Sequence, residues 1–267
     1  MNKKIFTETE LPMAQLQQAG LAHNGQVIIS KEEMDAMLSG RRTGMKLIYD
    51  LQTAEGTRIP AIDAKLSLGR DEQGKAELRI HPIYHKVDYP LELTEQEVDQ
   101  LISGQSQGIY KVVQRPGEAD QEFLFEYDKE TNEFIYTQPH LLQAPERVND
   151  EELTAAQKEL YRKGKEVELS DGTKFRYTGV DTDPVRSNRF LLIASILIDG
   201  GLTYLAFHGL KALEGGKHKD AKAALQSEGY GRAKDRYEEQ EFKIREKKVM
   251  KIGNDNEKAY SRSGVSR

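Results

Sequence analysis

A short motif that recurs three times constrains the fold of this chain more than any other feature. Residues 93–104 read LTEQEVDQLISG, in which Thr94 can cap a helix and Glu97 can return the hydrogen bond in a capping box. A glycine ten residues after Thr94 can end that helix in a left-handed conformation. Ser30 and Thr154 begin two further copies, each with Glu or Gln three residues on and Gly ten residues on. We interpret the three copies as an internal repeat.

Stretches that are typical of strands follow each copy of the motif. Alternating apolar and polar residues, bounded by turn signals at 71–74 and 170–172, predict antiparallel pairing. The predicted strands are 45–50, 59–68 and 76–80 after the first copy, 109–113, 123–127 and 134–137 after the second, and 167–169 and 175–177 after the third. The sequence therefore predicts an α+β fold, in which a repeated short capped helix is followed by an antiparallel meander or hairpin.

Changes of composition divide the chain into five segments. We expect a repeat-containing α+β domain over residues 1–148 and a third helix–hairpin unit over 149–180, which together form one compact body. The Asp-Thr-Asp-Pro sequence that begins at Asp181 predicts a linker over 181–189. An apolar helix or helical hairpin is then expected over 190–213, and a charged, flexible tail over 214–267.

Charge and cysteine content exclude several classes of function. The chain of 267 residues has no Cys, which removes disulfides, cysteine zinc sites and thiol catalysis. Residues 1–213 carry 25 Lys or Arg against 34 Asp or Glu, whereas residues 214–267 carry 14 against 10. An acidic body does not suit a nucleic-acid duplex, so only the tail could bind one. The N-terminus has two lysines but no apolar run after them, so we expect no secretory signal and a cytoplasmic protein.

The apolar segment 190–213, FLLIASILIDGGLTYLAFHGLKAL, is the strongest functional signal. Its hydropathy lies near the threshold for a spanning helix, but Asp199 and two glycines interrupt it. Three interpretations remain open: a single helix associated with the inner membrane, a helical hairpin, or a contact surface for a partner or a second copy. The candidate membrane or partner contacts are Phe190, Leu191, Leu192, Ile193, Ile196, Leu197, Ile198, Leu202, Tyr204, Leu205, Phe207, Leu210 and Leu213.

Three short sequences carry a resemblance to a known family. They are LPMAQL with AGL (residues 11–16 and 19–21), LSGRRTG (38–44), and AKLSL followed by HPI (64–68 and 81–83). In this order they resemble an uncharacterised domain family common on Bacteroidetes conjugative transposons and plasmids. Residues 153–167 resemble its usual uncharacterised companion domain, truncated to one unit, and Tyr84 stands where the family usually carries Arg. The resemblance implies a protein carried by mobile DNA and transfers no catalytic residue.

The remaining candidate sites have ordinary structural explanations beside the functional ones. His81 and His85 fall in an extended segment, where they would lie about 13 Å apart and could not share one metal ion. Arg41 and Arg42 could contact an anion, because guanidinium groups suit phosphate. Their segment lacks the Lys-Ser/Thr ending of a P-loop, however, and can equally be a turn between a helix and a strand.

No catalytic signature such as G-x-S-x-G, H-E-x-x-H or a dinucleotide motif is present, so we expect no enzyme, cofactor or metal. We expect a non-enzymatic accessory or interaction protein of a mobile element, with a protein-binding body anchored through residues 190–213. The alternative is a nucleic-acid accessory factor that contacts phosphates through Arg232, Lys234, Arg236, Lys243, Arg245, Lys247, Lys248 and Lys251. A hydrolase would need an exposed cleft in which acidic groups and a histidine converge.

Overall fold

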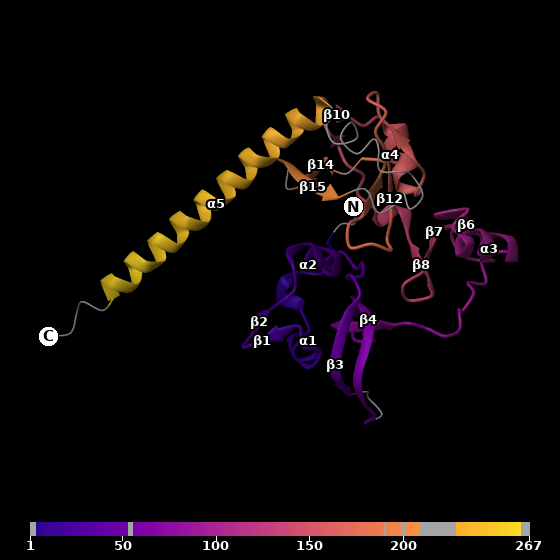
Figure 1. Cartoon of the computed structure of the whole chain (residues 1–267), viewed down its shortest axis with the longest axis horizontal. Helices are drawn as coiled ribbons and strands as arrows, with labels where there is room; N and C mark the ends of the chain where they lie inside the picture. The colour runs from indigo at the N-terminus through magenta and orange to yellow at the C-terminus, as the bar shows by residue number, and fades with distance from the viewer. Residues whose placement is uncertain (1–3, 53–55, 190, 199–200, 209–227, 263–267) are drawn as a thin grey trace, which may run out of the picture.

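The computed structural model describes residues 4–52, 56–189, 191–198, 201–208 and 228–262. The fold is mixed, with several small antiparallel sheets and short helices in a compact body and one long helix that leaves it (Figure 1). The helices are η1 (Glu8–Glu10), α1 (Met13–Gln18), α2 (Lys31–Leu38), α3 (Glu95–Ser103), η2 (Pro139–Leu141), α4 (Ala155–Arg162) and α5 (Glu228–Arg262).

The strands form five antiparallel sheets within the described residues. Two short strands pair alone, β1 (Ala22–His23) and β2 (Gln26–Val27). Three sheets each hold three strands in chain order: β3 (Lys46–Gln52), β4 (Arg58–Arg70) and β5 (Ala76–Pro82); β6 (Ile109–Val113), β7 (Gln121–Asp128) and β8 (Glu133–Thr137); and β11 (Val167–Glu168), β12 (Lys174–Tyr177) and β13 (Val185–Ser187). The fifth has the order β10-β9-β14-β15, from β9 (Arg147–Val148), β10 (Glu151–Glu152), β14 (Leu191–Ile198) and β15 (Gly201–His208).

The three capped helices form as the sequence predicts. Ser30, Thr94 and Thr154 each accept a hydrogen bond from the backbone three residues on, and all three complete a capping box. The glycines ten residues later all have positive φ, between 66° and 77°. Each helix precedes one of the three-stranded sheets, which gives a first unit (residues 4–82), a second unit (94–137) and a third unit (154–187).

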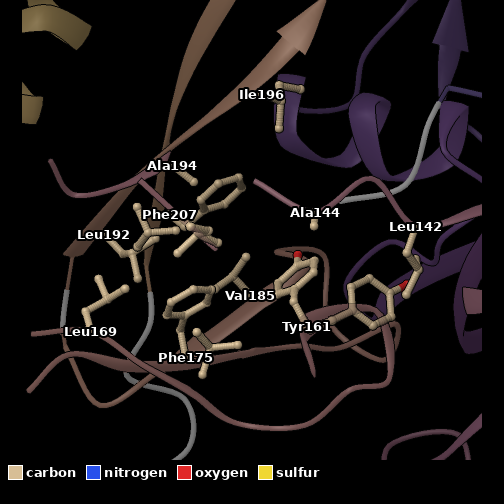
Figure 2. Close-up of a cluster of buried hydrophobic side chains, with 14 of the residues drawn as sticks. Leu142, Ala144, Tyr161, Leu169, Phe175, Val185, Leu192, Ala194, Ile196 and Phe207 are labelled. Carbon is tan, nitrogen blue, oxygen red and sulfur yellow. The ribbon is translucent and has the colours of Figure 1, made fainter. Parts of the chain in front are cut away.

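Each unit has its own buried side chains. In the first, Leu16 and Met37 from the helices pack with Leu66 of β4. In the second, Leu101 of α3 packs on Phe123 and Phe125 of β7. The core of the third unit is larger, because it includes side chains of β14 and β15 (Figure 2).

The apolar segment is not a helix or a helical hairpin, which corrects the sequence prediction. Over the described residues 191–198 and 201–208 it is an antiparallel β-hairpin, whose register pairs Leu192 with Phe207 and Ile193 with Ala206. One face of β14 points into the core of the third unit, where Leu192, Ala194 and Phe207 lie close to Phe175 and Val185 (Figure 2).

The other face of this hairpin is covered by α5, which explains the misinterpretation. Ile193 packs with Tyr230 and Ala233 of α5, so both faces of β14 are buried. A strand buried on both faces loses its alternating pattern and becomes a continuous apolar run, which periodicity cannot distinguish from a buried helix. The Asp199-Gly200 dipeptide, which we read as a helix break, is also a common signal for a hairpin.

Two further predictions are corrected in the C-terminal third. The segment 181–189 is not a linker, since β13 lies within it and pairs with β12. Of the tail expected to be flexible, residues 228–262 form α5, and its N-terminal part packs on β14 and β15. Among the described residues, no helix has the length and apolar character needed to cross a membrane.

Candidate interaction cleft

A cavity of about 1310 Å³ lies between β15, α5, α2 and the segment 139–143, and we call it the β15 cleft. Apolar side chains form one wall, namely Leu141, Ile196, Leu197, Leu205, Phe207 and Ile244. Charged residues also line the cleft, and we call these the charged wall: Lys4, Lys31, Asp35, Arg41 and Asp183. Small-molecule pockets usually measure about 300–1,000 Å³, so the volume suits a segment of polypeptide better than a metabolite.

The edge of β15 opens onto this cleft, since residues 203–207 all line it. β15 is the last strand of its sheet and pairs on one side only. The amide of the Gln240 side chain binds the backbone of Tyr204 on the other side: Tyr204 N donates to Gln240 Oε1 (2.9 Å), and Gln240 Nε2 donates to Tyr204 O (3.2 Å). Because backbone groups alternate along a strand, those of Leu202 and Ala206 point the same way as those of Tyr204.

Two kinds of contact hold α5 beside this edge. Tyr230 and Ala233 are buried against the hairpin. Asp150 accepts hydrogen bonds from Arg232 Nε and from Arg236 Nη1, both at 2.6 Å. The hydrogen bond from Arg232, with the charge of Arg236, holds the pKa of Asp150 below its usual value.

The charged wall is largely tied to the body by internal contacts. Lys4 Nζ lies 2.7 Å from Asp35 Oδ1 of α2. Arg41 Nη1 donates to the backbone carbonyls of Asp181 and Thr182, so this guanidinium joins the first unit to the loop between β12 and β13 of the third unit. Burial lowers the pKa of Arg41. Arg41 is thus placed as a structural cross-link, with the cleft beside it.

Arg42 lies in a buried cluster of charges that joins the first unit to the second. Its Nη1 lies 2.7 Å from Glu133 Oε2 and 3.5 Å from Asp128 Oδ2. Lys65 of β4 donates to both oxygens of Asp128, at 2.9 and 2.8 Å, and its Nζ lies 2.8 Å from Glu130 Oε2. We call these five residues the polar junction. Their internal pairing leaves the anion contact proposed for Arg41 and Arg42 without support from the geometry.

Two residues beside the polar junction, together with Glu133 of the junction, are arranged in the order of a catalytic triad. Ser67 Oγ lies 2.8 Å from His81 Nε2, and His81 Nδ1 lies 3.6 Å from Glu133 Oε2. Although burial raises the pKa of Glu133, hydrogen bonds from His81 and Arg42 bring it below the usual value.

Accessibility argues against catalysis by these residues. Ser67 is only 6% exposed in the interior of β4, and neither it nor His81 lines the cleft. A nucleophile must reach its substrate beside a preformed oxyanion site. The arrangement therefore amounts to one hydrogen bond between Ser67 and His81, with the carboxylate of Glu133 nearby. In the described part of the chain, no group of His, Asp and Glu side chains is placed to hold a metal ion.

The candidate contacts of the apolar segment divide between the interior and the cleft. Leu192, Ile193, Ile196 and Phe207 are buried, and Leu191, Tyr204 and Leu205 are partly buried. Leu197 and Leu202 are 50% and 43% exposed. Phe190, Leu210 and Leu213 lie outside the described residues, as does the side chain of Ile198. Most of the segment thus holds the fold together, and only its turn-proximal part and the edge of β15 reach the surface.

The candidate nucleic-acid contacts are also divided. Arg232 and Arg236 are held by Asp150, while Lys234 and Lys243 pair with Glu238 and Glu239 one helical turn away. Arg245 is exposed on α5. The side chains of Lys247, Lys248 and Lys251 lie outside the described residues, although the helix backbone continues past them.

Comparison with known proteins adds one finding. A family model described as "Protein of unknown function (DUF4099)" matches residues 6–90, which include the first unit and the connection that follows it. The searches of curated proteins and of solved structures find no match. Arg42, Lys65, Ser67 and His81 all lie within the matched residues, whereas β15, α5 and Gln240 lie outside them.

Proposed function

We propose that this chain is a non-enzymatic interaction protein that binds an extended segment of a partner protein along the edge of β15. The observation that carries the proposal is the pairing of Tyr204 with Gln240. A side-chain amide there satisfies one backbone N–H and one C=O, as the neighbouring strand of a sheet would. An added strand could replace it and extend the pairing to the outward backbone groups of Leu202 and Ala206.

The two walls of the β15 cleft suit such a ligand. Side chains of an added strand would alternate between the apolar wall, with Leu205 and Phe207, and the open side of the cleft. Main-chain hydrogen bonds would supply affinity, and the apolar wall would select β-branched or aromatic side chains. The charged wall, with Lys31 and Asp183, would favour polar residues at the remaining positions.

The proposal moves the partner contact from the whole apolar segment 190–213 to the edge of β15. Residues 192–196 are buried in this fold, and this burial supports assigning the partner contact to the edge of β15. Because the motifs within residues 11–83 and 153–167 resemble proteins of conjugative elements, we propose that the partner is another protein of a mobile element. The nucleic-acid alternative has less support at Arg232 and Arg236, because both of these candidate phosphate contacts are already paired with Asp150.

A proline at Ala206 tests the proposal with little damage to the hairpin. Ala206→Pro removes one of the outward N–H groups that an added strand would use, and this N–H points away from β14, so the β14–β15 ladder keeps its hydrogen bonds. The probe is a short fluorescent peptide of alternating valine and threonine, measured by anisotropy. We expect Ala206→Pro to weaken peptide binding about tenfold or more.

Two matched variants complete the test. Ala206→Ser keeps the N–H and should bind the peptide like the wild type. Gln240→Ala removes the competing amide and should bind it more tightly. The proposal fails if the wild type does not bind the peptide, or if Ala206→Pro binds it as well as Ala206→Ser does.

A further inference from the structure

An exposed aromatic strip runs along β8, at the edge of the sheet in the second unit. Tyr136 is 67% exposed and stacks edge-on against Phe123, with ring centroids 5.5 Å apart. On the same face, Phe134 meets Tyr89 edge-on at 6.2 Å, and Tyr89 is 61% exposed. Leu91, two residues farther along the chain, is fully exposed. We call Tyr89, Leu91, Phe134 and Tyr136 the aromatic strip.

The segment that carries this strip is acidic. Residues 83–137 contain 12 Asp or Glu against 4 Lys or Arg, a net charge of −8, although Asp128, Glu130 and Glu133 are paired with Arg42 and Lys65 in the polar junction. Helix α3, which packs on the same face of the sheet, carries Glu95, Glu97 and Asp99 and no basic residue. Lys111 neutralises Glu97 at 2.6 Å, but Glu95 and Asp99 are exposed. An apolar strip with an acidic border fits a partner that is both apolar and basic.

The C-terminal half of α5 has the complementary chemistry. Phe242 is 60% exposed on α5, and it lies on the side of the helix away from Ile244, which lines the β15 cleft. Residues 243–251 contain five Lys or Arg and one Glu, a net charge of +4. We call residues 241–262 the α5 arm, and at 1.5 Å per residue it extends for about 33 Å.

The direction of α5 decides which molecule the arm can reach. Figure 1 shows α5 leaving the body on the side opposite to β6 and α3, so the arm points away from the aromatic strip of its own molecule. The packing of Tyr230 and Ala233 and the ion pairs of Asp150 fix this direction. A contact between the arm and the strip must therefore be made by two copies.

We propose that the chain associates head to tail with a second copy of itself, through the α5 arm of one copy and the aromatic strip of the next. Phe242 contacts Tyr89 and Tyr136, while the net positive charge of the arm is attracted to the acids of α3. Such a contact is heterologous, so it leaves one arm and one strip open at the ends and allows chains of copies. Because charge pairs contribute much of the attraction, association weakens as salt is raised.

Sedimentation of the full chain over a range of concentrations tests the proposal. At low ionic strength the average mass should exceed that of one chain and rise with concentration, and high salt should return it toward the monomer. An arm variant, Arg245→Glu with Lys248→Glu, and a strip variant, Glu95→Lys with Asp99→Lys, should each remain monomeric. Circular dichroism verifies that both variants keep the wild-type fold.

Mixing the two variants gives the decisive result. The reversed arm of one variant complements the reversed strip of the other, so an equal mixture should associate again, although neither variant does so alone. The proposal is overturned if the wild type is monomeric at every concentration, or if the arm variant associates as the wild type does. It is also overturned if the monomeric wild type instead binds duplex DNA or anionic vesicles through the arm.

Discussion

The polar junction and the hairpin interface both join separate parts of the chain, but they do so by opposite chemistry. At the junction, Lys65 and Asp128 are almost completely buried and satisfy each other's charges. At the hairpin interface, Ile193 is buried against Tyr230 and Ala233 without any charge. The junction depends on exact partners because an unpaired buried charge is costly, whereas the hairpin interface depends on area and shape.

This difference predicts different tolerance to substitution. Apolar contacts can lose a methyl group and keep part of their stabilisation, but a buried ion pair that loses one partner leaves the other charge desolvated. One substitution should therefore lower the free energy of unfolding by different amounts in the two regions. A second, compensating substitution should also restore different fractions of that loss.

The largest effect is expected at Asp128. Asp128→Ala leaves Lys65 buried without its main partner and removes one partner of Arg42, so we expect the free energy of unfolding to fall by about 3–5 kcal/mol. Urea denaturation measures the loss. Glu130→Ala is the matched control, because the Glu130 side chain is 61% exposed and should cost at most about 1 kcal/mol. The double variant Lys65→Met with Asp128→Leu should recover most of the loss, and failure to recover it would contradict our account of the junction.

A smaller effect is expected at Ile193. Ile193→Ala opens a cavity between β14 and α5 and should cost about 2–4 kcal/mol in the same assay. The amides of residues 230–240 should also exchange faster with solvent, since the helix packs on this side chain. Leu197→Ala changes the same face of the strand at a half-exposed position and should cost less than about 1 kcal/mol. Equal losses in the two variants would show that α5 does not bury this face.

The smallest effect is expected at Asp150, where charge supplements apolar packing. Asp150→Asn should lower the free energy of unfolding by about 1 kcal/mol at neutral pH, a modest value because both arginine partners are largely exposed.

Acid should remove the difference in stability between the wild type and Asp150→Asn. The pKa of Asp150 is depressed in the folded protein, so its contribution is present above the unfolded pKa of about 3.9 and is lost as pH falls through the folded value. The wild type should therefore approach the Asn variant in acid. Glu239→Gln, at an exposed ion pair on the same helix, should leave the stability nearly unchanged at neutral pH and in acid. A difference between wild type and Asp150→Asn that grows in acid would contradict this assignment.

The comparison also separates what the sequence could predict from what it could not. The capped helices and most strands were predictable because their signals are local: Thr94 and Glu97 are three residues apart, and β6 spans the predicted residues 109–113. The polar junction was not predictable, since Lys65 and Asp128 are separated by 63 residues and each is ordinary in its own segment.

The β15 cleft was missed for a related reason. The apolar run at 191–208 was recognised, but its secondary structure depends on α5, which begins at Glu228. Gln240 carried no signal at all, because a glutamine on a charged helix is indistinguishable from its neighbours until the fold brings it to Tyr204. The Asp199-Gly200 dipeptide is a common hairpin turn, and this local signal could have predicted two antiparallel strands in the apolar run.

Burial of β14 on two sides has a consequence for synthesis on the ribosome. Proteins emerge from the N-terminus, and the three units can fold while later residues are still being translated. β14 and β15 can then complete the core of the third unit, but the other face of β14, with Leu191 and Ile193, stays open until α5 has emerged. An interrupted translation product that ends before Glu228 would display an apolar strand to its neighbours, which is a recognised route to aggregation. In the nascent chain, α5 is therefore needed to bury the second face of β14.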